Sequence, residues 1–337
     1  MANKLNIAIA GATGFVGLEL IKKIYFHPSV EIKYLFVKDS TGKNIYENLP
    51  KEIKKLPELK KIDLNLVNKC DVFFSSLPHA QLQKFANKIS SKVTIIDLSA
   101  DFRLPDIKTY LKWYNAEHQS PELLDKAVYG LSEVSRKQIK NSNLIACPGC
   151  YPTSILLPLI PLLKNKYINL NNIIADSKSG YSGAGKKIYN NTNYPNLNEN
   201  IAIYGVGNHR HMPEINIYSS LHANQNIDVL FTPHLIPTFR GMLSTIYVKS
   251  NKSLDEIYNS MDKFYKNELF IKIFKSKMIN TDQVINTNMM HVSVNNSNAK
   301  DTFIISSSID NLLKGAAGQA IQNFNIRFNF DEQLGLV

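Results

Sequence analysis

Short apolar runs alternate with amphipathic segments through the first half of the chain. The runs with the length and composition of buried strands are Leu5 to Ala10, Ile32 to Val37, Val72 to Ser75, Val93 to Ile96 and Leu144 to Ala146. Helix-like segments separate several of these runs. Because parallel neighbours need such crossover helices, the alternation predicts an α/β fold with a parallel, doubly wound sheet.

The pattern changes after residue 150, where longer strand candidates follow with fewer helices between them. These candidates are Ile173 to Lys178, Val229 to Thr232, Met242 to Lys249, Met289 to Val294 and Thr302 to Ser308. They predict a second, α+β domain with a mixed or antiparallel sheet covered by helices on one face. The helical pattern from Asn311 to Arg327 is expected to return to the first domain. The predicted domains are therefore residues 1–147 plus 312–337, and residues 148–311.

Length and composition suit two ordinary globular domains, since the chain has 337 residues of which 44% are hydrophobic and 20% charged. Every apolar stretch is shorter than the roughly 18 residues that span a bilayer, so we expect no membrane contact and a cytoplasmic location. The chain has 3 cysteines without the spacing of a disulfide framework, which also favours a reducing compartment.

The chain is basic, with a net charge of +11, which raises the question of nucleic-acid binding. Its lysines are spread along the sequence, and the densest group, between Lys51 and Lys61, has no interleaved aromatic residues. A solvated surface explains this pattern better than a nucleic-acid site does. The charge is nonetheless expected to attract small anionic molecules.

A glycine turn, Gly11-Ala12-Thr13-Gly14-Phe15-Val16-Gly17, follows the first predicted strand and opens a predicted helix. Such a turn lets the backbone approach a pyrophosphate while the helix N-terminus faces the phosphate charge, so it predicts a dinucleotide site. Ala12 stands where the commonest fingerprint has its first glycine. Lys38 and Asp39 follow the second strand. Lys38 can pair with a 2′-phosphate, which favours NADP, but two solvated turn residues fit nearly as well.

The segment Cys147-Pro148-Gly149-Cys150-Tyr151-Pro152-Thr153 lies between a short apolar run and a long one, which predicts a strand, a tight turn and a helix. A helix N-terminus lowers the pKa of a thiol beside it, so Cys150 is the candidate nucleophile. A buried structural cysteine and a redox dithiol are the alternatives. A structural zinc site needs four ligands, and Cys70 has no partner at ligand spacing, so we expect no metal.

Polar residues also gather where ligands bind in open α/β sheets. Ser75 to His79 and Asp97 to Arg103 both follow predicted strands. Arg103 can hold a carboxylate or phosphate through two hydrogen bonds, although a surface salt bridge with Asp101 explains it equally well.

Two clusters in the second half have the composition of a binding or catalytic site. Ser179 to Lys187 is a glycine-rich loop flanked by cations and suited to an anionic substrate. Gly207 to Glu214 contains His209 and His211, and a histidine has the right pKa to exchange a proton with Cys150. The two histidines are two positions apart, so in an extended segment they face opposite ways and one of them can reach the thiol.

Together these segments resemble the N-acetyl-gamma-glutamyl-phosphate reductase family, which is related to aspartate-semialdehyde dehydrogenase. The resemblance covers essentially the whole chain and is most specific in the cysteine and histidine segments. The matching segments are Gly11 to Gly17, Ser99 to Arg103, Pro148 to Thr153, Ser179 to Lys186, His209 to Glu214 and Lys314 to Ala320. By this resemblance the first domain is a Rossmann domain that binds NADP, and the second carries catalysis and dimerisation.

The resemblance also implies roles for individual residues. It places the nucleophile at Cys150 and the acid/base at His209, with His211 as the alternative. The implied cofactor contacts are Gly11, Thr13, Gly14, Phe15, Val16, Gly17, Lys38, Ser76, Pro78, Gly180, Gly183 and Asn323. The implied substrate contacts are Arg103, Ser182, Gly183 and Arg210. Family members usually carry Ser-Arg where this chain has Val37-Lys38, a departure that keeps the positive charge.

The implied reaction is the NADP-dependent reductive dephosphorylation of N-acetylglutamyl 5-phosphate in arginine biosynthesis, through a thioester on the cysteine. The partners are then the acyl phosphate and inorganic phosphate, with no nucleic acid, and similar enzymes form homodimers or homotetramers. Two alternatives stay open because fold does not fix function. One is the same chemistry on aspartyl or aminoadipyl phosphate, and the other is a non-enzymatic NADP-sensing protein.

Overall fold

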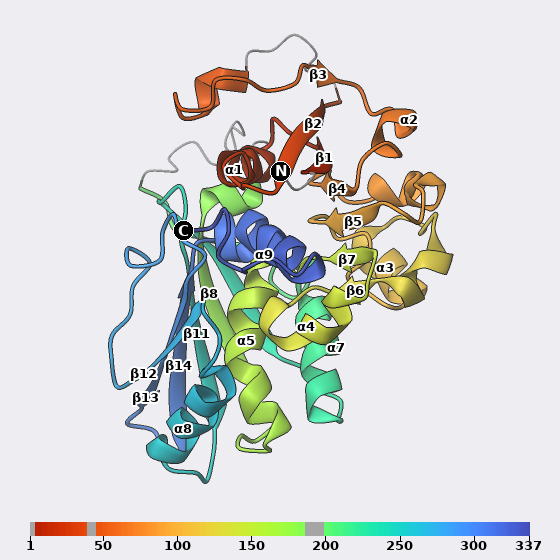
Figure 1. The fold of residues 1–337 in the computed structure, drawn as a ribbon. Coiled ribbons are helices and arrows are strands. Elements are labelled where there is room, and N and C mark those ends of the chain that lie inside the picture. The colour runs from red at the N-terminus through yellow and green to blue at the C-terminus, as the bar shows by residue number, and fades with distance from the viewer. Residues whose placement is uncertain (1–3, 39–44, 186–198) are drawn as a thin grey trace. The chain divides into compact units, whose positions relative to one another are not determined.

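The computed structural model describes residues 4–38, 45–185 and 199–337, so Asp39, Lys186 and Lys187 lie outside the described residues. The chain divides into two compact units. Unit 1 consists of residues 1–148 and 316–337, and unit 2 of residues 149–315. Figure 1 traces the elements of both.

Unit 1 is built on a parallel sheet. Its strands in the described residues are β1 (Leu5–Ala10), β2 (Val30–Phe36), β3 (Leu59–Lys60), β4 (Val72–Ser75), β5 (Thr94–Asp97), β6 (Val128–Tyr129) and β7 (Leu144–Ala146). Their order is β3-β2-β1-β4-β5-β7-β6, and each neighbouring pair is parallel. The helices are α1 (Phe15–Ile24), α2 (Leu64–Val67), α3 (Ile107–Tyr114), α4 (Ser132–Lys140) and α9 (Gly318–Arg327), with 3-10 turns η1 (Ile45–Asn48), η2 (Leu82–Lys84), η3 (Ala86–Lys88) and η4 (Pro121–Lys126). The predicted parallel sheet is confirmed.

The central strands β1, β4, β5 and β7 are largely buried, which explains why they are mostly apolar. On one face Ala8 and Phe73 pack with Val67 of α2 and Leu82 of η2. On the other face Phe74 contacts Phe324 of α9, with ring centroids 5.9 Å apart. The strand order reverses direction at β1 and β4, so the carboxyl ends of these two strands form the switch point where such sheets bind ligands.

Unit 2 contains a mixed sheet, as predicted. Its strands in the described residues are β8 (Ile174–Gly180), β9 (Ala202–Ile203), β10 (Leu230–Ile236), β11 (Met242–Lys249), β12 (Ile271–Lys275), β13 (Met290–Asn296) and β14 (Thr302–Ile309). The order is β12-β13-β14-β11-β8-β10-β9, in which β8/β10 and β12/β13 are parallel and the other pairs antiparallel. The helices are α5 (Cys150–Lys164), α7 (Met212–Ala223) and α8 (Leu254–Tyr265), with a 3-10 turn η5 (Tyr181–Ala184). The π-helical segment η6 (Leu313–Ala317) crosses the boundary between the units after Gly315. Helix α5 packs on β11 and β14, and α8 packs on β12 and β13 (Figure 1).

Helix α5 is continuous although it contains Pro158 and Pro161. A proline inside a helix costs about 3 kcal/mol, partly because the carbonyl four residues earlier loses its N–H partner, so the sequence predicts a helix that is either short or held by packing. The structure shows the second outcome. Ser307 donates its hydroxyl to the carbonyl of Ser154 at 2.6 Å, and Tyr265 donates its hydroxyl to the carbonyl of Leu157 at 2.5 Å. These are the two carbonyls that the prolines leave without an N–H.

Tyr265→Phe is therefore expected to lower the free energy of unfolding by about 1–3 kcal/mol, because it leaves the buried Leu157 carbonyl without a donor. Urea titration followed by circular dichroism measures this loss. Tyr258→Phe, on the same helix, serves as the control and should cost much less, because Tyr258 is only partly buried. Equal losses in the two variants would contradict the assigned role of Tyr265.

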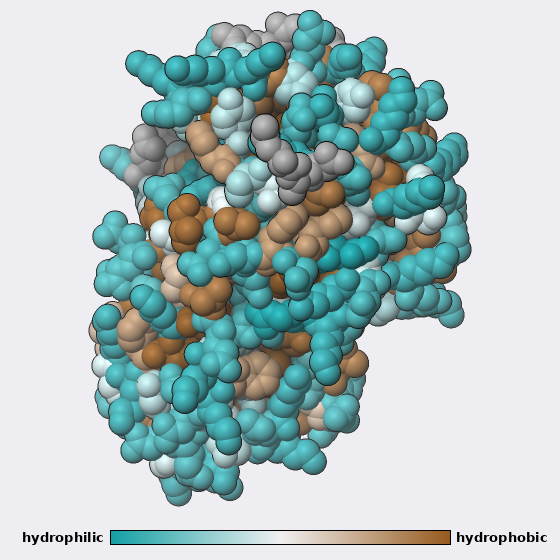
Figure 2. All heavy atoms as spheres, in the orientation of Figure 1, coloured by the Kyte–Doolittle hydropathy of each residue, from teal (hydrophilic) through white to brown (hydrophobic). Residues whose placement is uncertain are grey.

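The surface carries the basic charge of the chain. Figure 2 shows hydrophilic side chains spread over the visible face, with apolar side chains exposed between them. The lysines of the densest group, Lys51, Lys54, Lys55, Lys60 and Lys61, are all exposed. Among the helices of the described residues, none has the length and apolar character needed to cross a membrane.

Candidate active site

The glycine turn joins β1 to α1 at the switch point of the parallel sheet. Gly11 has a φ of +76°, which favours glycine, and a Cβ on it would lie 2.4 Å from the carbonyl oxygen of Ser76. A Cβ on Gly17 would lie 2.2 Å from the carbonyl oxygen of Gly11, so α1 packs directly on the turn. Gly14 is the N-cap of α1 and makes no side-chain cap, and the first turn of α1 has no acidic residue. This helix N-terminus fits the pyrophosphate of a dinucleotide.

Further predicted cofactor residues of unit 1 differ in their exposure. Ser76 donates its hydroxyl to the carbonyl of Ala10 at 2.8 Å, which ties the end of β4 to the end of β1. Lys38 is exposed directly after β2, and Pro78 is exposed after β4. The predicted residues that are partly buried at the turn are Thr13, Phe15 and Val16. An exposed Lys38 is accessible to an anionic group, as a contact with a 2′-phosphate requires.

Asn323, on α9, is completely buried and its amide braces unit 1. Its Nδ2 donates to the carbonyl of Gly130 at 2.8 Å and contacts the sulfur of Cys147 at 3.6 Å. Its Oδ1 accepts the hydroxyl of Ser132 at 2.7 Å. These bonds hold α9 against the segment before α4, so the structure gives Asn323 a packing role, and its contact with a cofactor stays a prediction.

Arg103 lies in a buried turn and not on the surface, so the alternative of a surface salt bridge with Asp101 is wrong. The two residues are 7% and 0% exposed, respectively. Arg103 donates Nε to the carbonyl of Cys147 at 2.7 Å and Nη2 to the carbonyl of Leu98 at 2.9 Å. Asp101 accepts the Tyr110 hydroxyl at 3.0 Å. The turn thus fixes the guanidinium against the residue that lies three positions before Cys150.

Asp97, the last residue of β5, is a buried carboxyl beside this turn. Burial raises its pKa to about 7, and the charge of Asp101 adds to the rise, whereas hydrogen bonds from Ser99 and the charge of Arg103 oppose it. Both oxygens accept from Ser99, one from its N–H and one from its hydroxyl, each at 2.9 Å. The folded protein therefore binds a proton at Asp97 more tightly than the unfolded chain does.

The sign of this shift predicts how Asp97→Asn changes stability with pH. The stabilisation from protonated Asp97 is complete below pH 3.8, the ordinary pKa of the carboxyl. It is lost as the pH rises through about 7, its pKa in the folded protein. Asparagine stays neutral and can keep both contacts with Ser99. The free energy of unfolding of the variant, measured in urea, should therefore rise relative to that of the natural chain as the pH increases across this window. Asp106→Asn is the control: that exposed carboxylate has a pKa lowered by Thr109, and its effect should be flat in the same window. If the free energy of unfolding of Asp97→Asn changes with pH in parallel with that of the natural chain, the expectation is refuted.

Cys150 is the first residue of α5, and its backbone is anchored by a buried glutamate. Gly149, the N-cap of α5, donates its N–H to Oε1 of Glu214 at 2.8 Å. Glu214 is fully buried in the first turn of α7. The N–H of Thr153 donates to the carbonyl of Gly149 at 2.9 Å, as in any helical turn. The starts of α5 and α7 are thus joined beside the candidate nucleophile.

His211 lies against the same N-cap. A Cβ placed on Gly149 would be 2.4 Å from Nε2 of His211, so the imidazole occupies the space that a side chain at position 149 would need. Only glycine permits this contact between the ring and the backbone that leads into Cys150. Of the two histidines, His211 is the one described against the N-cap, whereas His209 contacts the ring of Tyr151, the second residue of α5.

His209 is surrounded by aromatic rings. Its ring centroid lies 5.4 Å from that of Tyr151, 5.3 Å from Tyr204 and 5.5 Å from Phe231. Its Nδ1 accepts the backbone N–H of His211 at 3.1 Å, so the neutral ring carries its proton on Nε2. Burial lowers the pKa of His209 to about 4, and the charge of Arg210 adds to the effect. His209 is therefore neutral near pH 7, and its acceptor nitrogen is engaged by the backbone.

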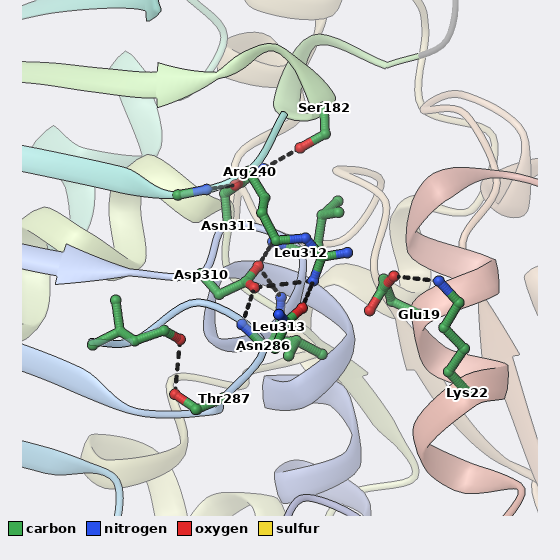
Figure 3. Close-up of polar contacts among 12 residues, drawn as sticks. Glu19, Lys22, Ser182, Arg240, Asn286, Thr287, Asp310, Asn311, Leu312 and Leu313 are labelled. Carbon is green, nitrogen blue, oxygen red and sulfur yellow. Dashed lines mark hydrogen bonds and ion pairs between the residues drawn. The ribbon is translucent and has the colours of Figure 1, made fainter. Parts of the chain in front are cut away.

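The predicted anion loop follows β8, and packing accounts for its glycines. A Cβ on Gly180 would lie 2.8 Å from the carbonyl oxygen of Phe239, and one on Gly183 would lie 3.0 Å from the hydroxyl of Ser179. The buried hydroxyl of Ser182 accepts from Nδ2 of Asn311 at 2.9 Å, as Figure 3 shows. Arg210, another predicted substrate residue, is exposed. Contacts of these residues with substrate or cofactor stay predictions.

Comparison with known proteins identifies the chain. The model "Semialdehyde dehydrogenase, NAD binding domain" matches residues 6–142, and "Semialdehyde dehydrogenase, dimerisation domain" matches residues 150–311. A protein of Clostridium beijerinckii named N-acetyl-gamma-glutamyl-phosphate reductase is 45% identical, with 98% of each chain covered. The chain belongs to this reductase family. A reductase of the same name from Ehrlichia canis is 41% identical over 100% of this chain and 98% of its own length.

Solved structures share the fold of this reductase family member. Aspartate semialdehyde dehydrogenase II of Vibrio cholerae, complexed with ASA, superposes with a TM-score of 0.70 at 19% identity, covering 97% of this chain and 99% of its own. The enzyme of Candida albicans with NADP gives a TM-score of 0.66 at 16% identity, covering 96% and 98%. At these identities the likeness concerns the fold alone.

Three residues of this reductase that bear on the surroundings of Cys150 were not singled out by the sequence: two lie beside the start of α5, and the third binds the turn that leads into Gly315. Glu214 stands in the histidine motif but gives no sequence signal that it binds the N-cap of α5. Gly315 reads as one of several small residues before α9, yet a Cβ on it would lie 2.7 Å from Cβ of Cys150. Asp310, fully buried, has no motif that marks it. In the described part of the chain, no cluster of three or more His, Cys, Asp or Glu is placed to hold a metal ion.

Proposed function

We propose that this protein is an NADP-dependent reductase that converts N-acetylglutamyl 5-phosphate to N-acetylglutamate 5-semialdehyde in arginine biosynthesis. The observation that carries the proposal is the start of α5. There Cys150 lies at a helix N-terminus with Glu214 and His211 against its N-cap, in a chain 45% identical to a named reductase. A helix N-terminus favours the thiolate, which is the nucleophilic form of cysteine.

In the first step the Cys150 thiolate attacks the acyl carbon, the carbon–oxygen bond to phosphate breaks, and inorganic phosphate leaves with the bonding electrons. The products are a thioester on Cys150 and free phosphate. Negative charge develops on the acyl oxygen as the thiolate adds. Backbone N–H groups at the start of α5, where the helix leaves its first donors outside its own hydrogen bonds, are proposed to stabilise this oxygen.

His211 is our choice for the acid/base, although the sequence ranks His209 first. His211 contacts the backbone that leads into Cys150, whereas the acceptor nitrogen of His209 is engaged by the N–H of His211. His211 would take the proton of the thiol before attack and return a proton when the reduced intermediate collapses to the aldehyde. His209 would hold the backbone of His211 in place.

The cofactor proposal rests on the glycine turn at α1 and on Lys38. The fit of the uncapped helix N-terminus to a pyrophosphate supports a dinucleotide held by the residues of this turn, and the exposed charge of Lys38 supports NADP over NAD. When bound, a nicotinamide dinucleotide supplies the hydride that reduces the thioester. Lys38 would pair with the 2′-phosphate as a point charge.

Arg103, which is buried and held by two carbonyls, is proposed to bind a carboxylate of the substrate, with Ser182, Gly183 and Arg210 as further contacts. The match of residues 150–311 to a dimerisation domain supports a homodimer or homotetramer.

The test is phosphate-dependent reduction of NADP by the purified protein with N-acetylglutamate semialdehyde, run beside aspartate semialdehyde and beside NAD. Turnover with the first substrate and preference for NADP are expected. Turnover with aspartate semialdehyde alone would support the proposed reaction but would reject N-acetylglutamate semialdehyde as the substrate. Tight NADP binding without turnover on either aldehyde would support the sensing alternative.

A further inference from the structure

Asp310, in the turn after β14, is a buried carboxylate on which four donors converge (Figure 3). Its Oδ1 accepts the N–H groups of Leu312 and Leu313 at 2.8 and 3.2 Å. Its Oδ2 accepts the N–H of Asn286 at 2.8 Å and Nη1 of Arg240 at 3.1 Å. The donors come from three separate segments of unit 2, so this one side chain sets where those segments meet.

The turn that Asp310 organises leads directly into Gly315. The backbone carbonyl of Asp310 accepts the N–H of Gly315 at 3.0 Å, so Asp310 binds the turn through its main chain as well as its side chain. A Cβ on Gly315 would lie 2.7 Å from Cβ and 3.2 Å from Cα of Cys150. The backbone at Gly315 therefore forms a wall beside the nucleophile, at a distance that leaves no room for a methyl group.

Arg240 makes the arrangement rigid. Its Nη1 also donates to Oδ1 of Asn286 at 2.8 Å, so the guanidinium joins the segment before β11 to the segment before β13 and to Asp310. The Asp310 carboxylate is completely buried, and a charge in that position is stabilised only when it is paired and fully hydrogen-bonded. An apolar turn of the same shape would hold unit 2 together without the desolvation cost of these charges. Stability alone therefore does not explain why Asp310 and Arg240 are paired here.

We propose that Asp310 is a positioning residue for the thiolate step: it fixes the turn at Gly315, and that turn restricts the position of Cys150 at the start of α5. The proposal rests on the proposed role of Cys150 as the nucleophile. Asp310 contacts neither the sulfur nor the reacting atoms in this scheme. It acts through the backbone wall, where a displacement of about 1 Å is enough to cost about 100-fold in rate.

Asp310→Asn tests the proposal. The amide offers one acceptor oxygen in place of two, so two of the four donors would face an NH2 group and the turn would shift. We expect kcat to fall about 100-fold with little change in KM, because positioning of reacting groups affects the chemical step. We also expect the pH midpoint of Cys150 alkylation, followed by mass spectrometry of its peptide, to move upward as the thiol leaves its place at the helix N-terminus.

Tyr265→Phe is the matched control, since it also removes a buried hydrogen bond of unit 2 but at the middle of α5. It should lose stability while keeping kcat and the alkylation midpoint. Gly315→Ala is the second variant, for the case that Asp310→Asn does not fold: it keeps all four donors and moves the wall directly, so it should reproduce both changes.

The proposal is overturned if the folded Asp310→Asn protein, or Gly315→Ala in its place, keeps both kcat and the alkylation midpoint at the values of Tyr265→Phe. Failure of the underlying assignment has a different signature. If Cys150 is not the nucleophile, Cys150→Ser retains turnover, whatever the behaviour of the Asp310 variant.

Discussion

Cys150→Ser is expected to lower kcat at least about 1,000-fold while leaving NADP affinity unchanged. The substitution keeps the size and polarity of the side chain but removes the only group that can form the thioester at this helix N-terminus. The glycine turn at α1, which is proposed to hold the dinucleotide, belongs to unit 1 and is untouched. Turnover is measured as phosphate-dependent NADP reduction, and affinity by isothermal titration.

Cys147→Ser is the matched control, since it changes the other cysteine of the same motif. The pKa of the Cys147 thiol is raised to about 12 by burial, and that of Cys70 to about 11, so neither supplies thiolate near neutral pH. Alkylation at pH 7 should accordingly modify Cys150 before the other two and should inactivate the protein in proportion. Inactivation by modification of Cys147 or Cys70, with Cys150 still free, would reject Cys150 as the nucleophile.

His211→Asn is expected to lower kcat by about 10²–10⁴-fold, the range that removal of a general acid/base produces. The ring contacts the N-cap of the Cys150 helix, and no other imidazole is described at that contact. KM should change little, because the proposed role concerns proton transfer and not substrate binding. Steady-state kinetics of the purified variant give both constants, and added imidazole should restore part of the rate.

His209→Asn is the comparison that separates the two histidines. Its ring packs among Tyr151, Tyr204 and Phe231, so its loss should reduce stability and lower kcat much less than His211→Asn does. His222→Asn, at the far end of α7, controls for any effect of removing a histidine from this region. A greater loss of kcat in His209→Asn than in His211→Asn would return the acid/base role to His209.

The sequence predicts the central strands of both sheets because burial makes them continuous or alternating apolar runs. The runs at Leu5 to Ala10, Val72 to Ser75 and Met242 to Lys249 coincide with β1, β4 and β11. The edge strands β3, β6 and β9 were not predicted, since each has only two residues and carries no periodicity. β12 was also missed, although Ile271 and Ile273 alternate with lysines as a half-buried strand does.

The site shows a similar division. Cys150 and the histidines stand in local motifs, so their chemistry can be read from neighbouring letters. Glu214 and Gly315 act through contacts with residues 65 and 165 positions away, Gly149 and Cys150, and one sequence holds no record of such pairs. The predicted helix from Asn311 is likewise interrupted, because Asp310 draws the first residues into a turn and a π-helical segment, and α9 begins only at Gly318.

The prolines of α5 have a consequence for the order of folding. A peptide of residues 150–164 would stay largely unstructured in water, because each interior proline costs about 3 kcal/mol and a short helix is marginal even without one. The two hydroxyls that replace the missing partners come from Tyr265 and Ser307, which are 108 and 153 positions away from the carbonyls they bind. The helix that carries Cys150 is therefore stabilised by α8 and β14, which come much later in the chain. A chain that ends before residue 307 lacks the hydroxyl of Ser307, so α5 would be less stable in it. The reactivity of Cys150, which depends on the start of this helix, is thereby coupled to completion of the fold.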